Sequence, residues 1–352
     1  MGCLGLFSAS EPFIRFAADV ALVAAILTTL LVIEIIILRE LRVARERRGA
    51  RFLQRWRPLV YEAMGGTAVK WPRIARRDTE TFLWFWNQLQ ETVRGDAKQT
   101  LTHVAAELRV DRMALRRLGR RSIASRLLAI VTLGNMQDPK YWPLVLPLTQ
   151  DAHPPVSLAA AQALIRINGQ RAVRELMLLF AQRSDLPVTR TLALLEQVDT
   201  AMVTKAIERA LPRADDVAAL RLIEFVSAGN AVALQAAMVH RLHRSRDPQI
   251  WASVLRRLSD PHHLSIVRRS CDHKVWFVRV QAANALGRMG AAEDVARLLR
   301  LLGDEQWWVR YRAAEALLKL PFLSRDALNA RAAEVGPEAL VMLDKVAARD
   351  AA

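Results

Sequence analysis

Residues 272–290 read DHKVWFVRVQAANALGRMG, and residues 304–320 read DEQWWVRYRAAEALLKL. Both stretches contain Asp, an aromatic pair, Val-Arg, Ala-Ala and Leu in the same order, and Val278 of the first aligns with Val309 of the second. Five similar segments precede them at nearly the same spacing, and they begin at Ser125, Val156, Val188, Leu220 and Ile250. Each segment is followed by a second helical pattern. Self-similarity at such a period, made of paired helices, is typical of an α-solenoid.

The block Asp-x(4–5)-Val-Arg-x-x-Ala-Ala-x-Ala-Leu at 272–286 and 304–317 resembles the HEAT repeat. It is most similar to the short HEAT-like type shared with phycobiliprotein lyase subunits. The resemblance covers 125–335, and it is strong in the last two repeats and degenerate in the middle. It implies that the Val-Arg helices lie on the convex side and that the second helices line the concave side. It also implies a polar ladder that braces the turns, formed by Asp272 with Arg279 and Asp304 with Arg310.

A long apolar segment lies near the start of the chain. Phe16 to Leu38 reads FAADVALVAAILTTLLVIEIIIL, in which only Asp19 and Glu34 are charged. At 1.5 Å per residue it spans roughly 34 Å, enough to cross a hydrocarbon core about 30 Å thick. A signal peptide would have a basic start and a small-residue cleavage site, whereas this segment ends ILRELR. We therefore expect a retained transmembrane helix. The carboxylate of Glu34 then either pairs with a partner helix or reaches the interface.

Arginines cluster directly after this segment. Only Arg15 precedes it, and by the positive-inside rule the first residues lie outside and the rest of the chain in the cytoplasm. The excess of Arg over Lys suggests a bacterial chain, so we expect the inner membrane. Each arginine near an anionic leaflet contributes about 1 kcal/mol. We expect topology and contact with anionic lipid headgroups to be the roles of Arg39, Arg42, Arg45, Arg47, Arg48, Arg51, Arg55 and Arg57.

The charge is concentrated beside the apolar segment. Residues 39–126 contain 21 Lys and Arg against 9 Asp and Glu, which gives +12 of the net +16. The expected fold class is all-α, an α-solenoid of about seven HEAT-like helix pairs preceded by one transmembrane helix. The expected segments are a short extracytoplasmic tail at 1–15, the transmembrane helix at 16–38, a basic juxtamembrane arm and linker at 39–77, an N-terminal helical cap at 78–124, HEAT-like repeats at 125–335 and a C-terminal cap at 336–352.

The chain carries no recognisable catalytic motif. One class of HEAT-like enzymes binds iron through His-Glu dipeptides, and the sequence contains none. It also lacks a Gly-rich phosphate loop, G-x-S-x-G and H-E-x-x-H. His240 and His243 are one helical turn apart and could share a metal, although such residues are more often solvated. Cys3 and Cys271 cannot form a disulfide framework. We therefore expect no enzyme activity, no cofactor and no metal site.

Two aromatic pairs occupy equivalent places in the last two repeats. Trp276-Phe277 and Trp307-Trp308 directly precede the Val-Arg of successive repeats. In a solenoid these turns line up along one edge, so we expect the aromatic side chains to form a row. Large aromatics at such positions are candidates for protein-binding anchors. Packing between repeats is the alternative.

Solenoids offer extended surfaces and little buried chemistry, which favours a scaffold over an enzyme. We expect a membrane-anchored cytoplasmic scaffold or adaptor that binds protein partners in an integral membrane complex. Accessory subunits of envelope polysaccharide machinery provide the analogy. The alternative is a HEAT-like nucleic-acid-binding or DNA-repair solenoid, with a HEAT-like lyase third. A nucleic-acid partner is not expected, because its surface would require a continuous strip from Arg171, Arg174, Arg209, Arg241, Arg244, Arg268, Arg269, Arg297 and Arg300.

Overall fold

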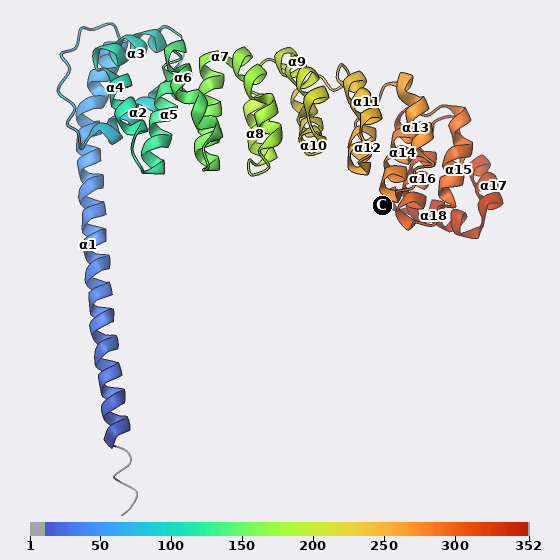
Figure 1. The fold of residues 1–352 in the computed structure, drawn as a ribbon, viewed down its shortest axis with the longest axis horizontal. Coiled ribbons are helices and arrows are strands. Elements are labelled where there is room, and N and C mark those ends of the chain that lie inside the picture. Colours follow the sequence, from blue (N-terminus) through green and yellow to red (C-terminus); the bar gives the residue numbers. More distant parts are fainter. Residues whose placement is uncertain (1–10, 94, 351–352) are drawn as a thin grey trace, which may run out of the picture. The chain divides into compact units, whose positions relative to one another are not determined.

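The computed structural model describes residues 11–93 and 95–350, and every regular element in these ranges is a helix (Figure 1). The expected all-α class is confirmed. Most of the expected tail at 1–15 falls in residues 1–10, which lie outside the described part of the chain, as does Cys3. The chain divides into two compact units, Met1–Thr132 and Leu133–Ala352.

The first unit is built on one helix of 54 residues, α1. The apolar segment and the arginines that follow it therefore lie on a single unbroken helix. The apolar side chains from Val20 to Leu41 are all exposed. The helices of this unit are α1 (Glu11–Met64), α2 (Thr79–Thr92), α3 (Asp96–Glu107) and α4 (Val110–Leu118), followed by the start of α5 (Ile123–Asn135).

The last turns of α1 are held by an aromatic cluster. Trp56 is 2% exposed and stacks on Phe52 and Trp71, at ring-centroid distances of 5.4 and 5.9 Å. Its ring also lies edge-on to Phe82 of α2 at 5.2 Å. The Trp71 indole nitrogen donates a hydrogen bond of 2.7 Å to the Glu107 carboxylate at the end of α3. Since aromatic side chains bury more apolar area than others, this cluster fixes α1 to the rest of the unit.

The second unit is a row of helix pairs (Figure 1). The helix α7 contains both members of one pair, because Asn168 takes a non-helical backbone conformation within it. The Asn168 side chain then accepts a hydrogen bond from the backbone of Arg171 and begins the second half. The pairs comprise α6 (Trp142–Val145), α7 (Pro154–Gln182), α8 (Val188–Leu195), α9 (Thr200–Ala210), α10 (Asp216–Phe225), α11 (Gln235–Arg244), α12 (Pro248–Leu255), α13 (Leu264–Ser270), α14 (Trp276–Met289), α15 (Val295–Leu302), α16 (Trp307–Lys319), α17 (Arg325–Val335) and α18 (Pro337–Asp350).

Short 3-10 turns connect several of these helices. They lie at Pro139–Tyr141, Leu146–Gln150, Leu211–Arg213, Val226–Ala228, Pro261–His263 and Ala292–Asp294.

Small residues allow successive Val-Arg helices to approach closely. A Cβ atom added to Gly287 would lie 2.9 Å from the Cβ of Ala316, and one added to Gly134 would lie 2.7 Å from the Cβ of Ala163. Both distances are too short for real Cβ contacts, so glycine is required at each place. The two contacts join equivalent positions of neighbouring repeats, with the same separation along the chain in both cases. The packing thus follows the register that the sequence period predicts.

The Val-Arg helices form the inner layer of the second unit. The helices α10, α12, α14 and α16 pack directly against one another in sequence order. The unit bends toward this layer, so the helices on its inner side come closer together than those on the outer side (Figure 1). The resemblance implied a convex position for the Val-Arg helices, and this expectation was wrong. The close Gly287–Ala316 contact gives the physical reason, since only small residues permit the tight inner spacing.

Candidate functional site

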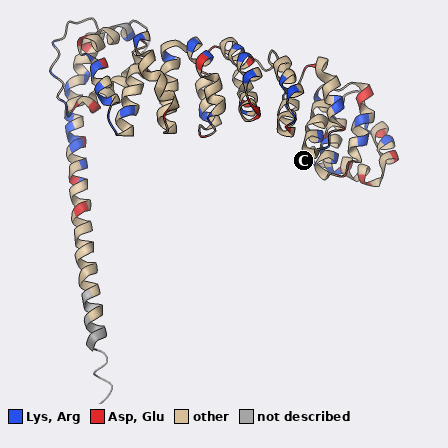
Figure 2. Ribbon diagram, viewed as in Figure 1, with Lys and Arg blue, Asp and Glu red and all other residues tan. Residues whose placement is uncertain are grey.

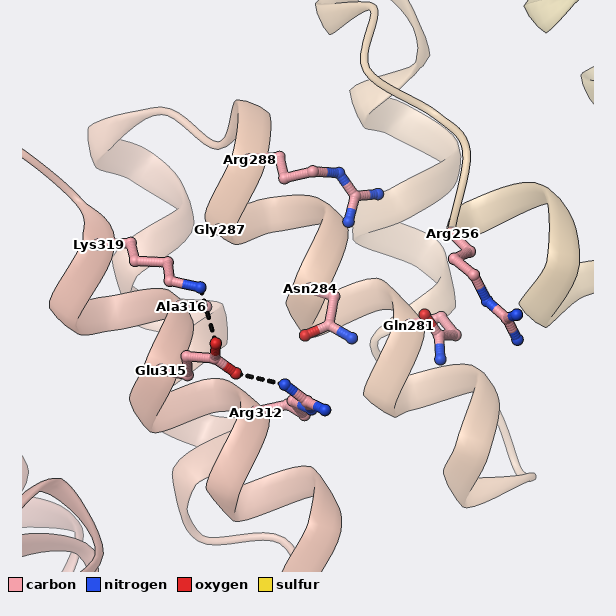
Figure 3. A pocket seen from close by; sticks show the side chains of 9 residues that line it. All are labelled: Arg256, Gln281, Asn284, Gly287, Arg288, Arg312, Glu315, Ala316 and Lys319. Atoms are coloured by element: carbon pink, nitrogen blue, oxygen red, sulfur yellow. Dashed lines mark hydrogen bonds and ion pairs between the residues drawn. The ribbon is translucent and has the colours of Figure 1, made fainter. Parts of the chain in front are cut away.

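A polar groove lies between α14 and α16 (Figure 3), with a volume of about 400 Å³. Its floor is made of Gly287 and Ala316, where no long side chain fits between the helices. Its walls are the side chains that project from the inner layer on either side of this floor. The lining residues are Arg256, Gln281, Asn284, Gly287, Arg288, Arg312, Glu315, Ala316 and Lys319.

The α14 wall presents two amides and a guanidinium on one helix face. Gln281, Asn284 and Arg288 follow one another at the helical i, i+3 and i+4 spacings, which places them on successive turns. Gln281 and Asn284 are half-buried, and neither side chain has a hydrogen-bond partner among residues 11–93 and 95–350. Each amide offers an acceptor oxygen and two donor hydrogens. This wall therefore has hydrogen-bonding capacity that the protein itself does not use.

Arg288 is fixed by the end of the preceding helix. Its Nη2 donates to the carbonyl oxygens of Leu255 and Leu258, at 2.8 and 3.1 Å. A cation is favourable there because the carbonyls at a helix C-terminus carry partial negative charge. Burial lowers the pKa of Arg288, and no carboxylate contacts its guanidinium in the described structure. Arg288 is thus a positioned cation without a counter-ion.

The α16 wall contains one carboxylate between two cations. The Glu315 carboxylate accepts hydrogen bonds from Arg312 at 2.6 Å and from Lys319 at 2.7 Å, and Asn284 faces this network across the groove (Figure 3). Burial alone raises the pKa of Glu315, but the hydrogen bonds from Lys319 and Arg312 hold it below its ordinary value. With Arg256 and Arg288, the groove holds four cations and one anion.

The groove was missed in the sequence because its residues are typical of solvent-exposed helix positions. A signal was nevertheless present in the repeat register. Gln281 is one repeat period before Arg312, and Asn284 is one period before Glu315. Equivalent positions of neighbouring repeats lie side by side in a solenoid, so polar residues at these positions must line one groove.

The polar ladder joins repeats instead of bracing each turn internally. Arg279 donates from Nε and Nη2 to the carboxylate of Asp304 at 2.7 and 2.8 Å, and from Nη1 to the carbonyl of His273. Burial alone raises the pKa of Asp304, while the Arg279 hydrogen bonds hold it below its ordinary value. Asp272 is not a partner of Arg279, since its carboxylate lies 3.6 Å from Arg300. The expected pairing of Asp272 with Arg279 was therefore wrong.

Arg310 takes only half of the corresponding role. Its Nη1 donates to the carbonyls of Asp304 and Glu305, at 2.8 and 3.1 Å, as Arg279 does in its own repeat. Its Nε is buried without a hydrogen-bond partner in the described structure. The C-terminal helix pair supplies no Asp in the equivalent register, so the ladder stops here.

A second brace was missed in the sequence. The fully buried Asp294 accepts hydrogen bonds from Arg268 at 2.7 and 3.0 Å and from the backbone of Ala291 at 2.9 Å. Burial alone raises the pKa of Asp294, and the hydrogen bonds from Arg268 and Ala291 hold it below its ordinary value. No motif indicated this pair, because the two residues lie in different helical elements and far apart in the chain.

The aromatic pairs are exposed at the start of their helices. Trp276 is 41% exposed, Trp307 36% and Trp308 53%, and Phe277 is half-buried. Trp307 stacks on Tyr311 at 5.1 Å and lies edge-on to Trp308 at 4.7 Å. In the described residues, ring contacts occur within each pair and no ring contact joins the two pairs. We call these four residues the aromatic edge.

All eight arginines of the juxtamembrane segment are exposed on α1 and form no ion pair in the described structure (Figure 2). Glu34 is exposed on the same helix. At 1.5 Å per residue, Arg57 lies roughly 27 Å along the axis from Arg39. Arg39, Arg42 and Arg45 fall within about one Debye length of the end of the apolar segment. Direct contact with lipid headgroups is therefore expected of these three more than of the others.

The described residues contain no group of three His, Cys, Asp or Glu that could hold a metal ion. His240 and His243 are exposed on α11. The thiol of Cys271 is buried and donates to the carbonyl of Val267. Burial raises the pKa of Cys271 to about 12, so the thiol stays protonated and unreactive at neutral pH.

The arginines that a nucleic-acid surface would require are largely engaged. Carboxylates pair with five of the nine, and only four extend without an ion-pair partner in the part of the chain that the structure describes. The paired ones are Arg171, Arg241, Arg268, Arg297 and Arg300. These side chains therefore do not form a continuous strip of free positive charge.

The stacked helix pairs, the ladder between repeats and the small-residue contacts define the class as an α-solenoid. A family model for HEAT repeats matches residues 110–196 and 222–318, which together make up more than half of the chain. The chain belongs to the HEAT-repeat family. No match was found among curated protein sequences. A solved structure of human deoxyhypusine hydroxylase in complex with glycerol shows 17% identity and a TM-score of 0.29, covering 68% of this chain and 96% of that one.

Proposed function

We propose that this protein is a membrane-anchored scaffold whose HEAT-repeat solenoid binds protein partners at the cytoplasmic face of the inner membrane. The observation that carries the proposal is α1. An apolar stretch of this helix, with a mean hydropathy of 2.8 over 18 residues, has none of its residues buried. In water such a surface is costly, and a lipid environment removes that cost.

The far end of α1 supports an anchor over a cleaved signal sequence. The helix runs without a break from the apolar stretch to Met64, and its last turns pack into the aromatic cluster around Trp56. The apolar segment and the folded first unit therefore share one helix. An anchor joined in this way to a folded unit holds that unit beside the membrane.

The orientation is proposed from the exposed arginines. Eight of them follow the apolar segment between Arg39 and Arg57, with only Glu40 and Glu46 opposed to them. Positive charge near the end of a span is retained on the cytoplasmic side. The repeats, which follow this end of the span, are then cytoplasmic, and the first residues lie outside.

Carbonate washing of membranes is expected to leave the full-length protein in the pellet, because α1 is held by lipid burial and not by charge. A reporter fused to the C-terminus is expected to be active in the cytoplasm. Neutralising Arg39, Arg42, Arg45, Arg47 and Arg48 together is expected to give mixed orientation. The matched control neutralises Arg73, Arg76, Arg77, Arg120 and Arg121, which lie farther from the span. Release of the wild-type chain by carbonate, or a periplasmic C-terminus, would contradict the proposal.

The aromatic edge is the proposed contact for the partner protein. Exposed tryptophans commonly carry much of an interface's energy, and about 2 kcal/mol or more is lost when such an anchor is truncated. Trp308→Ala and Trp276→Ala are therefore expected to lose the partner in co-purification from mild detergent while their melting temperatures stay close to wild type. Trp84→Ala, which removes an exposed tryptophan from α2, is the control. Large losses of stability in the edge variants would show that these residues serve repeat packing.

A further inference from the structure

We propose that the groove between α14 and α16 binds an extended, acidic segment of a partner protein. In this arrangement Gln281 and Asn284 hold the main chain of the segment, and Arg256 and Arg288 pair with its carboxylates. The proposal rests on the scaffold role above and names the chemistry of the segment bound. The groove is on the inner layer of the solenoid and is distinct from the aromatic edge.

The unused amides define what the groove recognises. Gln281 and Asn284 lie one turn apart on α14, so their Cβ atoms are about 5–6 Å from each other. Each offers a donor and an acceptor, and an extended main chain presents its N–H and C=O groups in the same complementary form. Alternate residues of an extended chain repeat at about 6.6 Å, which matches the spacing of the two amides.

The dimensions of the groove suit a short piece of extended chain. From Gln281 to Arg288 the α14 wall is roughly 10 Å long, at 1.5 Å per residue. An extended chain covers this length with about three residues. The floor at Gly287 and Ala316 carries no side chain beyond Cβ, so a main chain can approach the helices closely.

The charges select an acidic segment. Arg256 has no ion-pair partner in the described structure, and Arg288 is desolvated and contacts only carbonyl oxygens. Glu315 is shared by Arg312 and Lys319, so one carboxylate serves two cations. A carboxylate from a bound segment would supply the missing counter-charge. Complementary charge of this kind contributes to specificity and to the rate of association.

The test uses the full chain in neutral detergent micelles and a fluorescein-labelled peptide of alternating Glu and Ser, followed by fluorescence anisotropy at about 0.1 M salt. Binding is expected. Asn284→Ala and Gln281→Ala are each expected to weaken it about fivefold, the loss of one or two hydrogen bonds. Arg256→Gln is expected to weaken it by a similar factor. Circular dichroism checks that every variant is folded.

The matched control is Arg246→Gln. Arg246 is also exposed and unpaired in the described structure, but it lines a separate hollow of about 450 Å³ together with Trp251 and His273. This variant removes the same charge elsewhere and is expected to change binding less than about twofold. The same peptide with N-methylated amides is expected to lose as much affinity as the amide variants show.

Four results would overturn the proposal. They are absence of binding, full binding by Asn284→Ala and Gln281→Ala, equal losses in Arg246→Gln and Arg256→Gln, and tighter binding of a single-stranded oligothymidine of the same charge. The last result would assign the groove to nucleic acid. None of them bears on membrane anchoring or on the aromatic edge, which are tested with other residues. A failure of the groove proposal is therefore distinguishable from a failure of the scaffold proposal.

Discussion

Ala283→Glu is expected to prevent cooperative folding of the second unit. Ala283 is fully buried on the inner face of α14, where the helix packs against its neighbours. The new side chain would add volume to a closely packed contact and place a carboxylate there without a partner. Burial of an unpaired charge costs several kcal/mol, and the total stability of a domain is about 5–15 kcal/mol. Urea denaturation followed by circular dichroism is expected to show a loss of more than about 4 kcal/mol.

The same substitution at an exposed alanine provides the comparison. Ala296 lies on the neighbouring helix α15, and its side chain is exposed. Ala296→Glu is expected to change the free energy of unfolding by no more than about 0.5 kcal/mol. Equal denaturation midpoints for the two variants would contradict the repeat register that places Ala283 in the core.

The repeats could be predicted from the sequence because their packing positions recur. The alanines and leucines of the last two repeats align with one another, and the contact of Gly287 with Ala316 joins the same two aligned helices. The period does not reveal which side of the stack each helix occupies. It also does not show whether Arg279 pairs within its own repeat or with the next one. Both depend on the bend between repeats, which arises from contacts between residues far apart in the chain.

The candidate groove could be predicted only in part. Gln281, Asn284 and Glu315 are ordinary residues for an exposed helix face, and no motif distinguishes them. Their alignment with the next repeat is visible in the sequence, but their half-burial is not. The half-burial results from the close approach of α14 and α16, which brings two polar faces to the sides of one narrow floor. The site is thus a product of helix spacing and not of a local pattern.

The first unit shows a similar limit at the end of α1. The sequence indicated a basic arm and linker at 39–77, and the arginines dominate its composition. The structure extends α1 to Met64 and uses Trp56 and Trp71 of this segment in the aromatic cluster. Their partner Phe82 lies on α2, beyond the linker. A contact of this kind cannot be recognised from helical periodicity, because it joins two elements through a loop.

Trp56→Ala is expected to destabilise the first unit by about 3–5 kcal/mol, the usual range for a fully buried tryptophan. The cavity would lie where α1 meets Phe52, Trp71 and Phe82, so the last turns of α1 would lose their main contacts. Hydrogen exchange by mass spectrometry is expected to show faster exchange in α2 and α3.

Trp84→Ala is the matched control, because Trp84 lies on α2 with 51% of its surface exposed. It is expected to change the protection of α2 and α3 by less than about 0.5 kcal/mol. The two variants remove the same side chain, so a difference between them reports burial alone. If Trp56→Ala leaves the exchange unchanged, α1 is not fixed to the first unit. The membrane segment would then be a flexible tether, and the solenoid would not be held at a defined place beside the bilayer.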